Sequence, residues 1–193
     1  MIISPQSVEE RVLETLLEWS PIIVTGTDAF KKLYLQGIKV DVIIGEQHKL
    51  ASMKDEIIYQ EPIDKIIIER EEKVLDRGVD YLINKKSNVI YIFDDHLDTN
   101  LFTLNAKQKD LGINVINGHE LNHIIVNGLF EKWLPVGFSI TIIPSTINQA
   151  FTLTSPGYPS ESKVLSHEFK YIQKSEGLIS FASRQSFIVR EII

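Results

Sequence analysis

The order of short apolar runs along the chain constrains its fold more than any other feature. Up to residue 111, short β-type runs alternate with segments whose apolar residues recur at helical spacing. From residue 112 onward only short β-type runs remain, separated by Asn, Gly, Pro and Ser. Alternating strands and helices predict βαβ units and a mostly parallel sheet, whereas closely spaced strands predict an all-β domain. The sequence therefore predicts an α/β fold, with a Rossmann-like, mostly parallel domain over residues 1–115 and a small all-β sandwich domain over residues 116–193.

The same pattern predicts the individual elements. The capping box Ser7-Val8-Glu9-Glu10 predicts the start of a first helix, which Pro21 ends. We expect strands at residues 22–25, 40–44, 57–59, 65–68, 88–93, 113–116, 123–126, 138–143, 151–154 and 187–189, and further helices at residues 29–36, 71–85 and 99–111.

Charge and cysteine content restrict the partners of the chain. A net charge of −6 opposes nonspecific attraction to nucleic acid and to anionic membranes. The absence of cysteine removes disulfides, thiolate zinc sites and thiol catalysis, and it suits a reducing compartment. The N-terminus lacks the features of a signal peptide, and no apolar run approaches the roughly 20 residues that span a bilayer. We therefore expect a soluble cytoplasmic protein with neither nucleic acid nor membrane as a partner.

Polar turns follow four of the predicted strands. They are Thr25-Gly26-Thr27-Asp28, Gly45-Glu46-Gln47-His48, Glu69-Arg70-Glu71-Glu72 and Asp94-Asp95-His96-Leu97-Asp98. Ligands of open α/β sheets bind outside the carboxyl ends of the strands. Together these turns predict a polar cleft at one edge of the sheet, although each turn alone is also typical of a helix cap or a solvated loop.

Several of these segments resemble the thiamine pyrophosphokinase (thiamine diphosphokinase) family. GIKVDVIIG, residues 37–45, resembles the family's GIKPDxIIG, which leads into GDxDS. The segment at 96–101 resembles GGRxDHTLxN, with Asp98 on its aspartate, and residues 69–72 stand where the family has DKTD. Residues 140–144 resemble its SLLP strand, so the resemblance covers most of the chain in order and spacing. It implies an α/β domain joined to a β-sandwich, and transfer of diphosphate from ATP to thiamine.

The resemblance also implies a site. Its catalytic residues would be Asp98, Glu46 and Glu72. The groups that contact the nucleotide or a thiamine-like ligand would be Gly26, Thr27, Gly45, His48, Lys49 and His96, and the Mg²⁺ ligands would be Glu46, Glu69, Glu72 and Asp98. ATP and Mg²⁺ would be the cofactors. The resemblance further implies a homodimer whose cleft lies between the α/β domain of one subunit and the β domain of its partner.

The chain departs from the family pattern where the family binds metal and phosphate. Glu46, His48 and Lys49 replace the two aspartates and the serine of GDxDS. Thr25-Gly26-Thr27 replaces the family's DGG, and Asp94-Asp95-His96 replaces its Gly-Gly-Arg. Hard carboxylate oxygens hold Mg²⁺, whereas imidazole is a poor ligand for it and an ammonium repels it. These changes predict a degraded magnesium motif, with weak or no kinase activity and retained binding of a nucleotide or thiamine-like ligand.

Two alternatives stay open. In the first, the chain is an active diphosphotransferase with an altered site and substrate. Glu46, Glu69, Glu72 and Asp98 then hold the metal, while His48 and Lys49 contact phosphate. In the second, the chain is a non-catalytic binding or regulatory homodimer that keeps only the scaffold.

Two further features allow more than one interpretation. His119-Glu120-Leu121-Asn122-His123 matches the H-E-x-x-H pattern of zinc proteases, which needs a helix to bring both histidines to one metal. The flanking Asn117-Gly118 predicts a β-hairpin instead, so a zinc protease is a remote alternative.

Asp41, inside an apolar strand, is either a cap at the start of that strand or a direct ligand.

Overall fold

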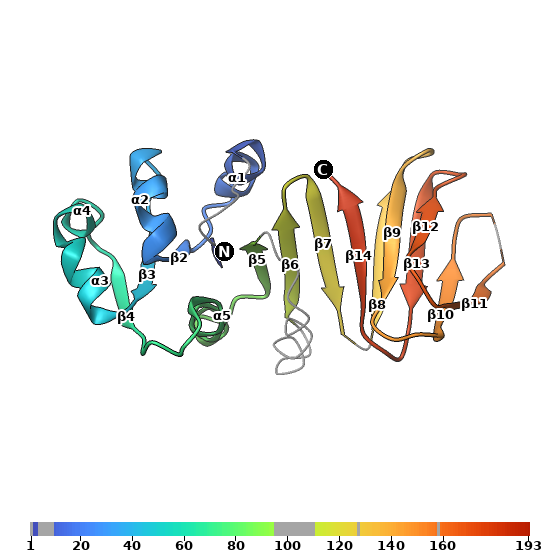
Figure 1. The fold of residues 1–193 in the computed structure, drawn as a ribbon. Coiled ribbons are helices and arrows are strands. Elements are labelled where there is room, and N and C mark those ends of the chain that lie inside the picture. The colour runs from blue at the N-terminus through green and yellow to red at the C-terminus, as the bar shows by residue number, and fades with distance from the viewer. Residues whose placement is uncertain (1, 4–9, 95–110, 127, 158) are drawn as a thin grey trace. The chain divides into compact units, whose positions relative to one another are not determined.

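The computed structural model describes residues 2–3, 10–94, 111–126, 128–157 and 159–193 (Figure 1). The chain divides into two compact units. The first contains residues 1–97 together with 116–118, and the second contains residues 98–115 and 119–193. The predicted division into two functional domains, between residues 115 and 116, stays a prediction.

The first unit contains a parallel sheet with helices against it. Its strands are β1 (Ile2–Ile3), β2 (Val24–Gly26), β3 (Val42–Gly45), β4 (Asp64–Ile67) and β5 (Val89–Phe93), and its helices are α1 (Glu10–Leu17), α2 (Thr27–Leu35), α3 (Gln47–Ser52), α4 (Lys54–Ile58) and α5 (Val74–Asn84). The strand order is β5-β1-β2-β3-β4, and each neighbouring pair is parallel. The direction of chain order therefore reverses at β1, which pairs with β2 on one side and with β5 on the other.

Burial explains why these segments form strands and helices. All residues of β2 and β3 are buried, as expected for central strands of a parallel sheet that is covered on both faces. Helix α2 packs on both strands through Ala29, Phe30 and Leu33, which lie on one helical face. Helix α5 packs on β1, β2 and β3 and buries Val79 and Leu82.

The second unit is antiparallel. Its strands are β6 (Gly112–Asn117), whose end belongs to the first unit, β7 (Glu120–Ile125), β8 (Leu129–Leu134), β9 (Ser139–Pro144), β10 (Gln149–Thr154), β11 (Glu161–Leu165), β12 (Phe169–Ile172), β13 (Gly177–Ala182) and β14 (Phe187–Ile192). They run in the orders β12-β9-β14-β7-β6 and β11-β10-β13-β8. Side chains from both groups of strands share one core, in which Phe151 contacts Phe187 edge to face at a centroid distance of 5.2 Å. Alternating burial along β10 shows that one face of its sheet lies on this core.

A buried carboxylate, Glu191 of β14, lies at the centre of a polar network in the second unit. Its side chain is 2% exposed, with Oε1 2.8 Å from His123 Nε2 and Oε2 2.5 Å from Lys132 Nζ. The other imidazole nitrogen of His123 lies 2.8 Å from Asn114 Oδ1. Burial raises the pKa of Glu191, but the contacts with His123 and Lys132 outweigh it, so the pKa lies below its ordinary value of 4.5. Glu191 is therefore a charged group that the surrounding strands hold in its ionised form.

The predicted fold class is confirmed in outline. The chain is mixed α/β, with a parallel sheet in its N-terminal part and antiparallel sheets in its C-terminal part. The finer description as a Rossmann-like domain and a β-sandwich stays a prediction. The capping box at residues 7–10 lies largely outside the described residues, and the helix predicted at residues 99–111 lies almost wholly outside them.

One predicted strand is wrong, and several elements were not predicted. Residues 57–59 were expected to be a strand, but Ile57 and Ile58 end helix α4. Ile57 is 1% exposed, whereas Ile58 and Tyr59 are 52% and 77% exposed. Strands β1, β8, β11, β12 and β13 and helix α3 were missed. Within the described ranges, no helix is long and apolar enough to cross a membrane.

Candidate functional site

The parallel sheet brings the predicted polar turns to one edge. Gly26 of β2 pairs in register with Ile44, and Gly45 of β3 pairs with Ile67 of β4. Because all these strands are parallel, the residues that follow them lie at the same carboxyl edge. The turns after β2, β3 and β4 therefore meet at this edge, as the sequence predicts.

Side chains from two of these turns form a mixed cluster of charges. The carboxylate of Glu46 lies 3.6 Å from the imidazole Nδ1 of His48 and 3.9 Å from Lys49 Nζ. The same ammonium lies 4.0 Å from Oδ1 of Asp28, which follows β2. Lys49 thus stands between two carboxylates that follow different strands, β2 and β3. Asp28 was not among the predicted site residues, although it lies in one of the predicted turns.

The EQHK sequence that follows Gly45 begins a helix. Glu46 is the N-cap of α3, with extended backbone angles, and its carbonyl accepts hydrogen bonds from the N–H groups of Lys49 and Leu50. This geometry places His48 and Lys49 in the first turn of α3, next to Glu46. The His48 side chain is 72% exposed and Glu46 is 30% exposed, so both are accessible to a ligand from solvent.

A further carboxylate, that of Glu72, lies after β4. Oε2 of Glu72 accepts a hydrogen bond from the backbone N–H of Glu69 at 2.8 Å, and Oε1 lies 3.8 Å from Arg77 Nε. Glu72 therefore closes the turn before α5, and an arginine partly neutralises its charge. Sequence reasoning missed Arg77 because nothing in the spacing shows that a residue inside α5 turns back onto this loop.

The two glycines at this edge have packing partners. A Cβ atom on Gly45 would lie 2.5 Å from Cγ2 of Thr27, which is buried at the start of α2. A Cβ atom on Gly26 would lie 3.3 Å from the side chain of Val74 in α5. Gly45 and Gly26 therefore let helices approach the strand ends closely, independently of any ligand.

The carboxylates of Glu46 and Glu72 at this edge contact other groups of the chain. Glu46 faces an ammonium and an imidazole, and the two oxygens of Glu72 face a backbone N–H and a guanidinium. Within the described ranges, no three His, Asp or Glu side chains are grouped so that they could hold a metal ion. Asp98, the fourth proposed ligand, and His96 lie outside the described residues. The magnesium set Glu46, Glu69, Glu72 and Asp98 stays a prediction.

Asp41 lies at the other edge of the sheet, just before β3. Its Oδ2 accepts a hydrogen bond from the backbone N–H of Ile23 at 2.8 Å, and Ile23 directly precedes β2. This geometry supports the interpretation of Asp41 as a cap at the start of the strand and places it away from the carboxyl edge.

The H-E-x-x-H sequence lies on a hairpin, as predicted. Gly118 has a positive φ of 53° in the turn between β6 and β7, and Glu120 to His123 belong to β7. Four residues of extended chain span about 13 Å, so His119 and His123 do not converge as they would on a helix. His123 instead contacts Glu191 and Asn114. The zinc-protease alternative therefore lacks the helix that it needs.

The chain therefore combines a parallel α/β unit with an antiparallel β unit, and polar turns lie at the carboxyl ends of its parallel strands. Solved structures of the same fold include thiamin pyrophosphokinase from Geobacillus thermodenitrificans, with a TM-score of 0.70 and 17% identity over 100% of this chain and 98% of that one. A thiamin pyrophosphokinase family protein from Enterococcus faecalis matches with a TM-score of 0.71 and 12% identity, over 100% and 97% of the two chains.

Thiamin pyrophosphokinase from Candida albicans matches with a TM-score of 0.66 and 13% identity, over 100% of this chain and 88% of that one. No protein-family model matches the sequence, and no curated protein matches it either. At these identities the comparisons establish the fold over the full length of the chain. The chain therefore has the fold of the thiamin pyrophosphokinases.

Proposed function

We propose that this chain is a thiamine pyrophosphokinase-like protein that keeps a small-molecule site at the carboxyl edge of its parallel sheet but has weak or no kinase activity. The full-length match to thiamin pyrophosphokinase structures supports the choice of fold and ligand class. The ligand would be a nucleotide or a thiamine-like molecule. A homodimer in the cytoplasm belongs to the same proposal.

The position of Lys49 carries the part of the proposal that concerns activity. Its ammonium lies within 4.0 Å of carboxylates on Asp28 and Glu46, where a metal ion that bridges two strand ends would need those oxygens. A tethered ammonium supplies one positive charge to a phosphate, but it cannot polarise the phosphate as a divalent Lewis acid does. Because diphosphate transfer relies on metal ions to neutralise developing charge, this arrangement favours binding over transfer.

Thermal shifts measured with and without Mg²⁺, together with an AMP-release assay, test the proposal. We expect ATP, AMP or thiamine diphosphate to raise the melting temperature, whether or not Mg²⁺ is present. A ligand at about 100 times its Kd adds about 2.7 kcal/mol of stability, which corresponds to a shift of roughly 5–10 °C in a chain of this size. AMP release from ATP and thiamine should stay at background. Rapid magnesium-dependent AMP release would refute the degraded-site proposal, and the absence of any thermal shift would refute the ligand site.

Restoring the family pattern gives the matching gain-of-function experiment. The triple variant Glu46→Asp, His48→Asp, Lys49→Ser removes the imidazole and the ammonium and provides two carboxylates. We expect its thermal shift with ATP to become dependent on Mg²⁺. Lys54→Ser, which removes a lysine from α4, is the control and should leave the thermal shift unchanged.

A second candidate function is diphosphate transfer to a different acceptor. The observation that favours it is the pair formed by His48 and Lys49, which places an imidazole and an ammonium on one turn, where both can contact a polyphosphate. In that case AMP release would depend on an acceptor other than thiamine, and Lys49→Ala would lower its rate. A non-catalytic regulatory homodimer is the outcome if no acceptor supports release.

A further inference from the structure

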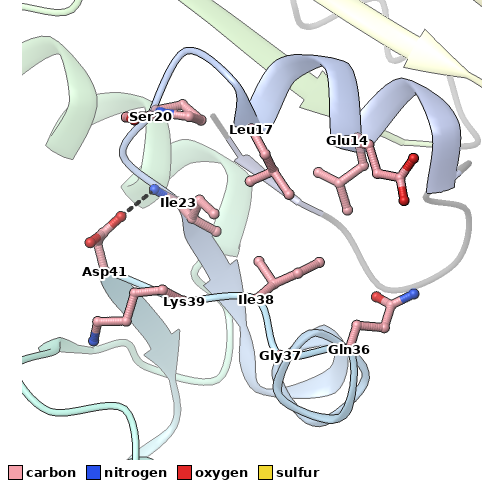
Figure 2. Close-up of a pocket in the computed structure, with 11 residues that line it drawn as sticks. Glu14, Leu17, Ser20, Ile23, Gln36, Gly37, Ile38, Lys39 and Asp41 are labelled. Atoms are coloured by element: carbon pink, nitrogen blue, oxygen red, sulfur yellow. Dashed lines mark hydrogen bonds between the residues drawn. The ribbon is translucent and has the colours of Figure 1, made fainter.

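A cavity lies at the amino edge of the parallel sheet, away from the carboxyl edge described above. It has a volume of about 550 Å³, and α1, the loop before β2, and the connection from α2 to β3 line it (Figure 2). Ile23 and Asp41, which line the cavity, immediately precede β2 and β3. This volume falls within the range of small-molecule pockets in proteins.

The middle of the cavity is apolar. Leu13 is 1% exposed and Ile23 is 4% exposed, and both belong to the core of the first unit. Leu17 of α1 and Ile38 are partly buried, and Figure 2 shows their side chains pointing into the space between α1 and the α2–β3 connection. A ligand that fills this region would gain binding free energy from the apolar surface that it covers.

Polar side chains flank this apolar middle. In Figure 2, Glu14 and Gln36 lie on one side of Leu17 and Ile38, whereas Ser20, Lys39 and Asp41 lie on the other. The cavity lining therefore carries two carboxylates, one at each polar side, and one ammonium.

The contacts of the charged groups determine which charge a ligand would meet. Lys39 donates hydrogen bonds to the carbonyls of Gln60 and Pro62, neither of which lines the cavity. Asp41 uses Oδ2 to accept the Ile23 N–H, which leaves Oδ1 for another donor. Within the part of the chain that the structure describes, no hydrogen bond or ion pair holds the carboxylate of Glu14. The uncommitted charges that face the cavity are therefore negative.

We infer that this cavity binds a linear aliphatic amine with a cationic group at each end, a diamine. Its methylene chain lies on Leu13, Leu17, Ile23 and Ile38. One ammonium pairs with Glu14, and the other pairs with Asp41. The net charge of −6 attracts such a dication to the protein from a distance. This site is independent of the function proposed for the carboxyl edge.

Calorimetric titration of the full chain with putrescine, cadaverine and hexamethylenediamine tests the inference. We expect saturable binding that depends on chain length and weakens as salt rises. The uncharged diol of the same length is the ligand control and should not bind. Methyl-labelled NMR gives the location: Ile23 and Ile38 should shift on diamine addition, whereas Ile140 and Ile179 in the second unit should not.

Charge-removing variants test the residues. Glu14→Gln should weaken diamine binding by about two- to fivefold, as expected for one exposed ion pair, without affecting folding. Asp41→Asn keeps an oxygen for the Ile23 N–H and should weaken binding similarly. Glu18→Gln, an exposed carboxylate just beyond α1 that does not line the cavity, is the matched control. Equal binding of the diol, equal loss with Glu18→Gln, or no binding at millimolar diamine would overturn the inference.

Discussion

At the scale of single residues, Gly45 shows how a glycine at a strand end can have two explanations. Its place before the polar EQHK turn predicts close approach of a ligand. The structure adds a second reason, because a Cβ on Gly45 would lie only 2.5 Å from the Thr27 methyl. Gly45 is therefore required for the packing of α2 on β3 whether or not a ligand binds there.

Substitution of Gly45 tests this packing. Gly45→Ala should lower the free energy of unfolding by about 1–3 kcal/mol, because the new methyl overpacks against buried Thr27. The double variant with Thr27→Ser removes Cγ2 and should recover much of that loss. Urea denaturation measures both variants. If the double variant is no more stable than Gly45→Ala, the Thr27 contact is not the cause.

Glu191 is the second residue whose role only the structure shows. Its pKa is below 4.5 in the folded protein, because its contacts with His123 and Lys132 favour the ionised form despite burial. A group with a lowered pKa stabilises the fold fully above its unfolded pKa and loses that stabilisation as the pH falls through its folded pKa. The Glu191 network therefore contributes to acid denaturation below about pH 4.5.

Neutralising Glu191 should remove this dependence. Glu191→Gln removes the carboxylate that Lys132 and His123 contact. Because the Lys132 side chain is 38% exposed and water can solvate its ammonium, we expect a loss of about 1–3 kcal/mol at pH 7. Between pH 5 and pH 3 the stability of the variant should fall less steeply than that of the wild type. Glu161→Gln, an exposed carboxylate on β11, is the control and should leave the pH profile unchanged. Parallel pH profiles for Glu191→Gln and the wild type would contradict this role for Glu191.

At the scale of elements, continuous apolar runs were easier to predict than runs that charged or polar residues interrupt. Strands β3, β5 and β9 follow apolar runs that are long enough to identify, and each lies within a residue or two of its predicted bounds. The run at Ile57 and Ile58 is too short to separate helix from strand by periodicity. The burial of Ile57 beside exposed Ile58 and Tyr59 shows which side of α4 faces the core.

Other elements exist because of their neighbours. Strand β1 has two residues, and its place is defined by pairing with β2 and β5 rather than by its own sequence. Strand β8 alternates in burial through Phe130, Lys132 and Leu134, but Lys132 conceals the apolar pattern. Lys132 is partly buried because its ammonium contacts the carboxylate of Glu191 on β14.

At the scale of the whole molecule, the β11-β10-β13-β8 sheet carries exposed apolar side chains. Trp133 and Leu178 are each 56% exposed and lie directly opposite each other on β8 and β13, and Leu129 on β8 is 53% exposed. The cross-strand pair formed by Trp133 and Leu178 therefore exposes two large apolar side chains next to each other, as interaction surfaces do. It supports the homodimer in the proposed function.

Light scattering coupled to size-exclusion chromatography tests the homodimer. We expect about twice the mass of one chain for the wild type, and a shift toward the single-chain mass for Trp133→Glu, because a charge in the buried centre of an interface is costly. Ile172→Glu, at 52% exposure on β12 of the other sheet, is the matched control. A monomeric wild type, or equal effects of both variants, would contradict this interface.

The sequence by itself determined the mixed α/β order of elements and the polar turns after the strands, because hydrophobic periodicity and strand ends are local properties of the chain. It also identified Glu46, His48 and Lys49 as the point of departure from the family pattern. Only the tertiary structure decided that Lys49 reaches Asp28, that Thr27 packs on Gly45 and that Glu191 meets His123 and Lys132. Each of these pairs joins residues from different elements, and the distance between such residues is fixed by strand order and register, which local patterns do not encode.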